Sequence, residues 1–279
     1  FIENGTSGSQ NIIISQGSGA NITIPAGQTK AIYSNGAGSG AAMVDAFATL
    51  NVVDLLVDDD LTVAGDVAVT GDYSSTTSGT SNLRLGVNAG NSIASGGNYN
   101  VVVGDEAGTA LTTGDNNVAV GYQALATEDA NGESVAIGYR ALKVQNAGAA
   151  AYNTAVGYDT GVAVTTGTDN TIVGGLAGDA IITGEFNVAV GKDALGSDTD
   201  GGYNVGIGAL ALSTQNFTTT TNSYNTAVGG LAGRRITTGV QNTIVGGRAG
   251  DHLTDADSNV AIGYGALTAD TLGSTSIAI

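Results

Sequence analysis

The sequence predicts an all-β fold, a parallel β-roll or β-helix solenoid of coils about 17 residues long. Three observations predict it. A five-residue phrase, Asn-Val-Ala-Val-Gly at 117–121, recurs with small substitutions, and its commonest spacing is 17 residues. The apolar run in each copy is too short for a helix and rich in Val, Ile and Thr, as strands are. Self-similarity at a fixed period is typical of stacked repeat architectures.

The copies also follow a second, longer period. They begin at Asn82, Asn100, Asn117, Ser134, Asn153, Asn170, Asn187, Asn204, Asn225, Asn242, Asn259 and Ser276. Copies four apart are the most alike, which gives a super-repeat of four coils and about 71 or 72 residues. The two longest linkers, at 143–152 and 213–224, both follow a fourth coil. Insertions at one corner are what a stacked solenoid tolerates, because such loops leave the stack undisturbed.

Each predicted strand is apolar on both faces. In the copy at 117–121, Val118 and Val120 lie on one face and Ala119 on the other. A strand that is apolar on both sides is covered on both sides. One face is covered by the opposite wall of its own coil, and the other needs another chain. Because small residues suit close approach around a shared axis, we expect the alanine face to meet sister chains in a homotrimer.

The residues that flank each strand predict the corners of the coil. A Gly follows nearly every strand, which indicates a corner with positive φ. An Asn precedes most strands, and Asn tolerates left-handed geometry and caps turns. Stacked in register, these Asn side chains are expected to form a ladder. The predicted structural corners include Asn117, Gly121, Asn153, Gly157, Asn187, Gly191, Asn259 and Gly263.

Residues 1–50 precede the repeats and predict a small β-rich domain. Strand candidates at 11–15, 20–24 and 29–33 are separated by Gly-Ser and Pro-Ala-Gly turns. Apolar residues recur at helical spacing over 40–50, which predicts a closing helix.

Residues 51–81 predict a neck between that domain and the solenoid, which we place at 82–279. Short strand candidates at 61–63 and 67–69 are separated by Ala-Gly-Asp. Such phrases resemble the intertwined β-prism shafts of trimeric phage fibres. A Ser/Thr-rich step then leads to the first coil.

The repeats themselves resemble two groups of fibrous proteins. The phrases NVAVGYQAL at 117, SVAIGYRAL at 134 and NVAIGYGAL at 259 resemble the head repeats of trimeric autotransporter adhesins. They are even more similar to the repeat arrays of tail fibre and related structural proteins of marine bacteriophages, particularly those infecting cyanobacteria. The resemblance covers about residues 82–279, and the longer coil with its four-coil super-repeat departs from the adhesin pattern.

This resemblance implies a trimeric structural fibre protein of a phage virion that presents or mediates attachment to the host cell surface. The implied partners are sister chains, other virion proteins, and a glycan or protein of the host surface. A bacterial trimeric adhesin head remains the alternative.

Composition excludes several classes of function. With 25 acidic and 8 basic residues the net charge is −17, so nucleic acid is not an expected partner. There is no Cys for a disulfide framework, and no apolar run approaches the ~20 residues that a membrane helix needs. Because the chain starts at Phe1 without Met and stops inside a repeat, we expect it to be the ordered part of a longer polypeptide.

The motifs that suggest chemistry have structural explanations. Residues 206–211 fit a GxGxxA dinucleotide fingerprint, but they align with the corner of every other copy and no helix pattern follows. His252 is the only histidine, which disfavours a zinc site, and a Ser-His-Asp triad would need it as the base. We expect a solvated loop histidine, no cofactor, no metal ligand set and no catalytic residue. A glycan-cleaving enzyme would need paired carboxylates in a groove, whereas the acidic residues here scatter over loops.

Two further features keep an alternative open. The acidic runs at 58–60 and 255–257 are expected to be solvated turns, with a calcium site as the alternative. Tyrosines recur at two positions of the repeat, after the corner Gly and before the Asn; we expect them to stack along a corner, with contact to sugar rings as the alternative. They are Tyr122, Tyr139, Tyr158 and Tyr264 at the first position, and Tyr99, Tyr152, Tyr203 and Tyr224 at the second.

Overall fold

The computed structural model describes residues 2–6, 8–15, 20–34, 43–45 and 78–279. The chain divides into two units, Phe1–Ala68 and Val69–Ile279. The acidic run at 58–60 and the predicted neck strands lie outside the described residues.

The first unit is built from short antiparallel strand pairs. Its strands are β1 (Ile2–Glu3), β2 (Ile12–Ile14), β3 (Ile22–Ile24), β4 (Thr29–Lys30), β5 (Ile32–Ser34) and β6 (Met43–Asp45). Strand β1 pairs with β4, β2 with β3, and β5 with β6. The buried side chain of Asn4 donates to the carbonyls of Gln10 and Ile24, both at 2.8 Å, and so ties the chain between β1 and β2 to the end of β3.

The predicted helix over 40–50 is wrong for the residues that the structure describes there. Met43–Asp45 form β6 and pair with β5 in antiparallel register. A short apolar run has no decisive period of its own, so the available partner strand decides its conformation. The three predicted strands of this unit are confirmed, with the third divided into β4 and β5.

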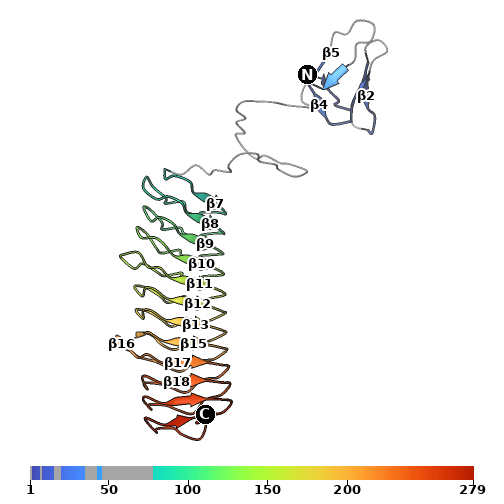
Figure 1. Cartoon of the computed structure of the whole chain (residues 1–279). Coiled ribbons are helices and arrows are strands. Elements are labelled where there is room, and N and C mark those ends of the chain that lie inside the picture. Colours follow the sequence, from blue (N-terminus) through green and yellow to red (C-terminus); the bar gives the residue numbers. More distant parts are fainter. Residues whose placement is uncertain (1, 7, 16–19, 35–42, 46–77) are drawn as a thin grey trace. The chain divides into compact units, whose positions relative to one another are not determined.

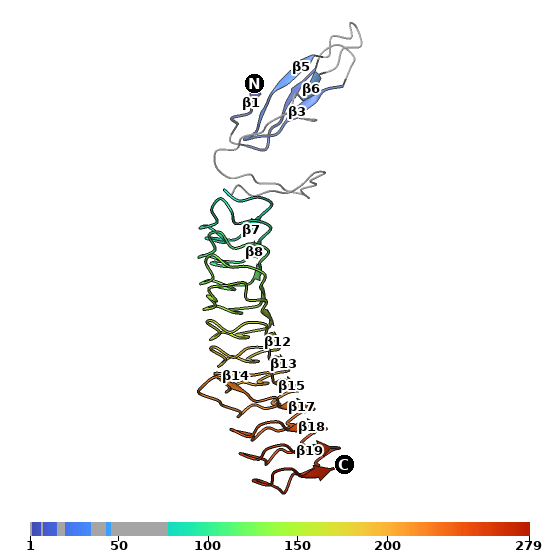
Figure 2. The ribbon, with the colours of Figure 1, turned by 60° about the vertical axis from the view of Figure 1, so that its left-hand side comes forward.

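The second unit is a parallel β-solenoid in which each coil contributes one strand to a single long sheet (Figure 1). The twelve strands are β7 (Leu83–Leu85), β8 (Val101–Val103), β9 (Val118–Val120), β10 (Val135–Ile137), β11 (Thr154–Val156), β12 (Thr171–Val173), β13 (Val188–Val190), β15 (Val205–Ile207), β17 (Thr226–Val228), β18 (Thr243–Val245), β19 (Val260–Ile262) and β20 (Ile277–Ala278). Equivalent residues of consecutive coils lie opposite one another in parallel register, as Ala119 and Ala136 do. Figure 2 shows the coils stacked in sequence order.

Two smaller strands belong to the loop wall of the solenoid. Strand β14 (Gly201–Gly202) pairs in parallel with β16 (Thr221–Asn222), which lies in the long linker after the eighth coil. The predicted fold class and coil length are therefore confirmed, and the insertion stays in the stack through its own pair of strands.

The two faces of the long sheet are reversed relative to our expectation. In the long-sheet strands from β8 to β19, the middle residue, such as Ala119 or Ile172, is completely buried within the single chain, whereas its neighbours, such as Val118 and Val120, face outward. The alanine face therefore does not meet sister chains. It is small because the opposite wall of the same narrow coil packs against it, through residues such as Ala124 and Leu125.

The core explains the four-coil super-repeat. We number positions within a coil from its Asn or Ser. Position 9 is then Gly or Leu in each of the eleven complete coils, and the type of residue at position 12 depends on which of the two is present. Glycine-type coils have Gly at position 9 and an aliphatic residue at position 12; these pairs are Gly90/Ile93, Gly108/Leu111, Gly161/Val164, Gly178/Ile181, Gly233/Ile236 and Gly250/Leu253. Leucine-type coils have Leu at position 9 and a polar residue at position 12; these pairs are Leu125/Glu128, Leu142/Gln145, Leu195/Asp198, Leu212/Gln215 and Leu267/Asp270.

The exchange conserves core volume. In the glycine-type coil at 170–186, a Cβ added to Gly178 would lie 2.9 Å from Cδ1 of Ile181, because that side chain already occupies the space. In the leucine-type coil at 187–203, the buried Leu195 fills the equivalent space from position 9. Two glycine-type coils followed by two leucine-type coils give the longer period read from the sequence.

Candidate functional surfaces of the solenoid

The corner asparagines form a buried ladder along the stack. Asn117 is typical: its backbone N–H donates to Oδ1 of Asn100 at 2.9 Å, and its own Oδ1 accepts from the N–H of Ser134 at 3.1 Å. Its Nδ2 group donates to the carbonyl of Asn131, at 3.2 Å, in the same coil. The Asn117 side chain thus satisfies backbone groups of two coils, and this role is structural.

The predicted corner residues lie at equivalent places in the stack. Asn153, Asn187 and Asn259 are buried like Asn117, and the Gly residues that follow their strands have strongly positive φ. The φ angles are 129° at Gly121, 146° at Gly157, 128° at Gly191 and 119° at Gly263.

Close packing between coils reinforces the requirement for Gly at these corners. A Cβ on Gly121 would lie 2.4 Å from the carbonyl oxygen of Gly138 in the next coil. The corner glycines therefore allow consecutive coils to approach closely, and their positive φ also turns the chain at the corner.

The outward face of the long sheet carries two columns of side chains, the first and third residues of each strand. The third-residue column is aliphatic from Leu85 to Val245 and on to Ile262, and the first-residue column is Val or Thr in most coils. Ile137, Ile207 and Ile262 each expose more than a third of their surface. Neither outward column contains a charged residue, although the chain as a whole carries a net charge of −17.

Tyrosines stack along the rod, as predicted for three of those after the corner Gly. The ring centroids of Tyr122 and Tyr139 lie 5.5 Å apart, and those of Tyr139 and Tyr158 lie 5.0 Å apart with nearly parallel planes. The guanidinium of Arg140 lies 5.1 Å from the Tyr139 ring centroid and pairs with Asp159, both of whose carboxylate oxygens accept at 2.7 Å. This hydrogen bonding to Asp159 raises the pKa of Arg140.

A second aromatic ladder precedes the corner asparagines. Phe186 and Tyr203 stack at 4.8 Å, and Tyr203 and Tyr224 lie 5.1 Å apart at a tilt. Phe186 interrupts the tyrosine pattern, which is why the sequence did not single it out. In the same column, hydrogen bonding to Glu133 raises the pKa of Tyr152.

Buried polar side chains at position 12 hold the two long linkers. Gln145 donates to Glu128 Oε2 at 3.0 Å and to Ser134 Oγ at 2.9 Å, and it accepts from Nδ2 of Asn153 at 2.8 Å. The chain therefore leaves and re-enters the stack at fixed points on either side of the linker at 143–152.

The same arrangement recurs four coils later. Gln215 donates to Asp198, whose other oxygen accepts from the N–H groups of Gly201 and Phe217, and Asn225 donates to Gln215 Oε1 at 2.9 Å. Burial raises the pKa of Asp198, while these hydrogen bonds oppose the shift. Reasoning from sequence missed both networks, although the alternation of acid and Gln at position 12 was visible.

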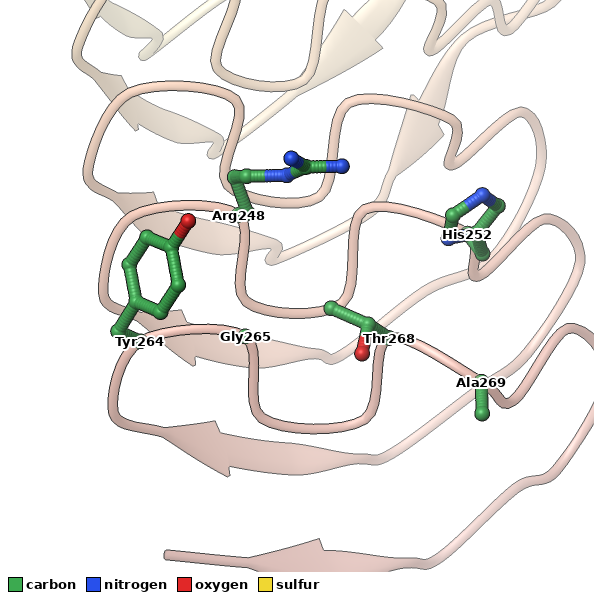
Figure 3. A pocket seen from close by; sticks show the side chains of 6 residues that line it. All are labelled: Arg248, His252, Tyr264, Gly265, Thr268 and Ala269. Carbon is green, nitrogen blue, oxygen red and sulfur yellow. The ribbon is translucent and has the colours of Figure 1, made fainter.

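An open pocket lies on the loop wall of the tenth and eleventh coils (Figure 3). Its volume is about 310 Å³. The lining residues are Arg248, His252, Tyr264, Gly265, Thr268 and Ala269. Behind them, the buried carboxylate of Asp251 lies 3.2 Å from Arg248 Nε and 2.9 Å from His252 Nδ1.

Most of the residues that suggested chemistry in the sequence lie in the strands, corners and loops of the coils. Gly206 lies inside strand β15 and Gly208 is a corner with φ 127°, so the dinucleotide-like phrase is part of a coil. His252 is half-exposed and contacts Asp251. Asp255 accepts hydrogen bonds from Thr237 and Thr238, which lower its pKa. Among the described residues, no group of three or more His, Asp or Glu side chains is arranged to hold a metal ion.

Within the part of the chain that the structure describes, no helix has the length and apolar character needed to cross a membrane. Comparison with known proteins found no matching protein-family model, curated protein or solved structure.

Proposed function

We propose that this chain is a segment of a structural fibre protein of a phage virion, a homotrimeric shaft or head that presents or mediates attachment to the host cell. The observation that carries the proposal is the outward face of the long sheet, two uncharged columns of mostly aliphatic side chains that continue over twelve strands. Consecutive strands lie ~4.8 Å apart, which makes this face on the order of 55 Å long. A partner with the same repeat over that length is a second copy of the chain.

The two columns favour a threefold arrangement. Around a threefold axis each chain contacts two neighbours, so the first-residue column meets one neighbour and the third-residue column meets the other. Burial of exposed Val and Ile side chains stabilises such an assembly at about 25 cal/mol per Å². The net charge of −17 opposes association elsewhere on the surface and so favours this uncharged face.

The proposed role is mechanical and not enzymatic. A rigid shaft holds a receptor-binding region away from the particle, and contacts repeated threefold raise avidity without a tight single site. Other virion proteins would join through further segments of the fibre. Release of oligosaccharide from host polysaccharide by the purified chain would overturn the non-enzymatic role.

The mass of the protein in solution tests the assembly. Three chains of 27.3 kDa make about 82 kDa, which light scattering during size-exclusion chromatography resolves from a single chain. Val156→Lys combined with Val190→Lys places charge on the outward face and is expected to give folded monomers. Ser197→Lys, at an exposed loop, is the control and should leave the mass unchanged. A stable wild-type monomer would contradict the proposal.

The virion assignment has its own test. Mass spectrometry of purified phage particles should find peptides of this chain. Their recovery from the envelope of the bacterium, and not from particles, would favour the alternative function as a bacterial trimeric adhesin head.

A further inference from the structure

The tyrosine ladder at position 6 of the coil, the residue after the corner Gly, ends at a coil that has no side chain at this position. Tyr122, Tyr139 and Tyr158 occupy this position in three consecutive coils, and Gly175 occupies it in the next. The backbone continues without interruption, because the N–H of Leu176 donates to the carbonyl of Tyr158 at 2.9 Å. Only the side chain is missing from the stack.

The space at this step is open. A Cβ added to Gly175 would meet no atom within 4 Å, and its φ lies outside the left-handed region. Tyr158 exposes 56% of its surface, whereas Tyr122 and Tyr139 each expose 40%. No aromatic ring of the following coil covers Tyr158, because Gly175 has no side chain there.

The other side of the space is polar. Lys192 occupies the sixth position of the following coil, so it lies two coils from Tyr158, a separation of ~10 Å. Its ammonium group donates to Asp193 at 2.6 Å and remains largely exposed. The space is therefore bounded on one side by the ring of Tyr158 and on the other by the charged groups of Lys192 and Asp193. Its depth along the stack corresponds to the one aromatic ring that is missing at Gly175.

We propose that the space over Gly175, which we call the Gly175 gap, binds the ring of a neutral pyranose sugar against the free face of Tyr158. The C–H face of a pyranose packs on an aromatic ring, and its hydroxyl groups both donate and accept hydrogen bonds. Asp193 then accepts from a hydroxyl and Lys192 donates to one. An anionic sugar fits less well, because Asp159 and Asp193 lie beside the gap and the chain carries a net charge of −17.

Open space together with a ring in the preceding coil distinguishes this position from the two other glycines of the same column. At Gly247 an added Cβ would lie 3.4 Å from Cδ2 of Tyr264, and no aromatic ring precedes it. Gly230 also occupies a sixth position with open space, since the nearest atom to an added Cβ is the carbonyl oxygen of Ala209 at 4.0 Å. No aromatic ring precedes it there. Gly230 therefore provides a matched control for substitutions at Gly175.

The inference deepens the proposed attachment role by naming the ligand class, and it rests on that role for its biological meaning. The gap lies within one chain, however, so binding and trimer formation are tested separately. A monomer that binds sugar would overturn the assembly alone, and a trimer that binds none would overturn the sugar site alone.

The test is saturation-transfer NMR with three neutral probes, the methyl α-glycosides of glucose, galactose and mannose. We expect at least one to bind the wild-type chain with a dissociation constant in the millimolar range, typical of one stacked ring. Gly175→Tyr fills the gap and completes the ladder, so it should abolish the transfer. Gly230→Tyr adds the same side chain elsewhere and should not reduce the transfer.

A second variant tests the contribution of the ring itself. Tyr158→Leu keeps Tyr139 covered but removes the aromatic face, and it should weaken binding about tenfold. Melting temperatures within a few degrees of wild type will establish that each variant folds. Failure of all three glycosides to bind the wild type, or full binding by Gly175→Tyr, would overturn the proposal.

Discussion

The glycine-type and leucine-type coils fill the same core in two different ways. In the glycine-type coil the large side chain comes from position 12, as Ile181 does over Gly178. In the leucine-type coil it comes from position 9, and the space at position 12 is taken by Glu128, Gln145, Asp198 or Gln215. The backbone does not change, since position 9 has φ between 47° and 57° in both types.

This difference indicates the role of the polar residues at position 12 of the leucine-type coils. A buried carboxylate or amide costs free energy unless it is hydrogen-bonded. Here Gln145 and Gln215 connect a leucine-type coil to the asparagine of the next coil, across the two longest linkers. The glycine-type coils carry neither of these two linkers, and their position 12 is wholly aliphatic. Aliphatic filling and polar anchoring of a loop are thus alternative uses of one core position.

The largest expected effect concerns the corner Gly, which the two coil types share. Gly121→Ala in a leucine-type coil and Gly174→Ala in a glycine-type coil should each lower the free energy of unfolding by about 3 kcal/mol or more. In both, the new Cβ would lie under 3 Å from backbone of the next coil at a φ of 129°. Urea denaturation followed by circular dichroism measures the loss. Gly175→Ala is the control and should stay within about 0.5 kcal/mol of wild type.

The next effect tests the exchange of volume directly. Gly178→Leu should cost about 2–3 kcal/mol, because Ile181 already fills the space. Adding Ile181→Ala should restore at least ~1 kcal/mol, since it converts the site toward the leucine-type arrangement. A double-mutant cycle in urea gives the coupling, and simple additivity of the two costs would refute the exchange.

The polar position predicts how stability depends on pH. Because burial raises the pKa of Asp198, the folded state binds its proton more tightly than the unfolded state does. Stability should therefore rise as pH falls from neutral through the folded pKa toward the usual value of 3.8, and Asp198→Asn should remove this component.

Asp255 supplies the opposite case on the surface. Hydrogen bonds from Thr237 and Thr238 lower its pKa, so its contribution is present above the unfolded pKa and is lost as pH falls through the folded value. Denaturation midpoints from pH 7 to pH 3 for Asp198→Asn and Asp255→Asn should deviate from wild type in opposite directions. Deviations of the same sign would contradict the assignment.

The smallest expected effect concerns an exposed ion pair on the outer surface of a coil. Lys192 and Asp193 form an exposed ion pair in a leucine-type coil, and Lys192→Ala should change stability by less than about 0.5 kcal/mol. Thermal melting at low and high salt measures it. A larger loss would mean that the outer surface of the coils contributes to the distinction between the two types.

The sequence predicted the coils because the strand, the corner Gly and the Asn recur at fixed spacing, and each recurs for a local backbone reason. It did not predict which strand face is interior. Val118 and Ala119 are both apolar, and only the width of the coil decides between them. Nor did the repeat reveal that Gln123 and Leu125 adopt left-handed φ, which residues other than Gly seldom do. The buried contacts of Asp198 and Gln215 depend on a linker whose path no local pattern specifies.

The asparagine ladder also bears on the mechanics of the rod. Its hydrogen bonds run along the stack, so a pull on the two ends of the solenoid loads every junction between coils in series. At the fourth coil Ser134 replaces Asn, and its hydroxyl accepts from Gln145. The carboxamide of Gln145 also accepts from Nδ2 of Asn153, so tension at this junction passes through a side chain that lies outside the asparagine column.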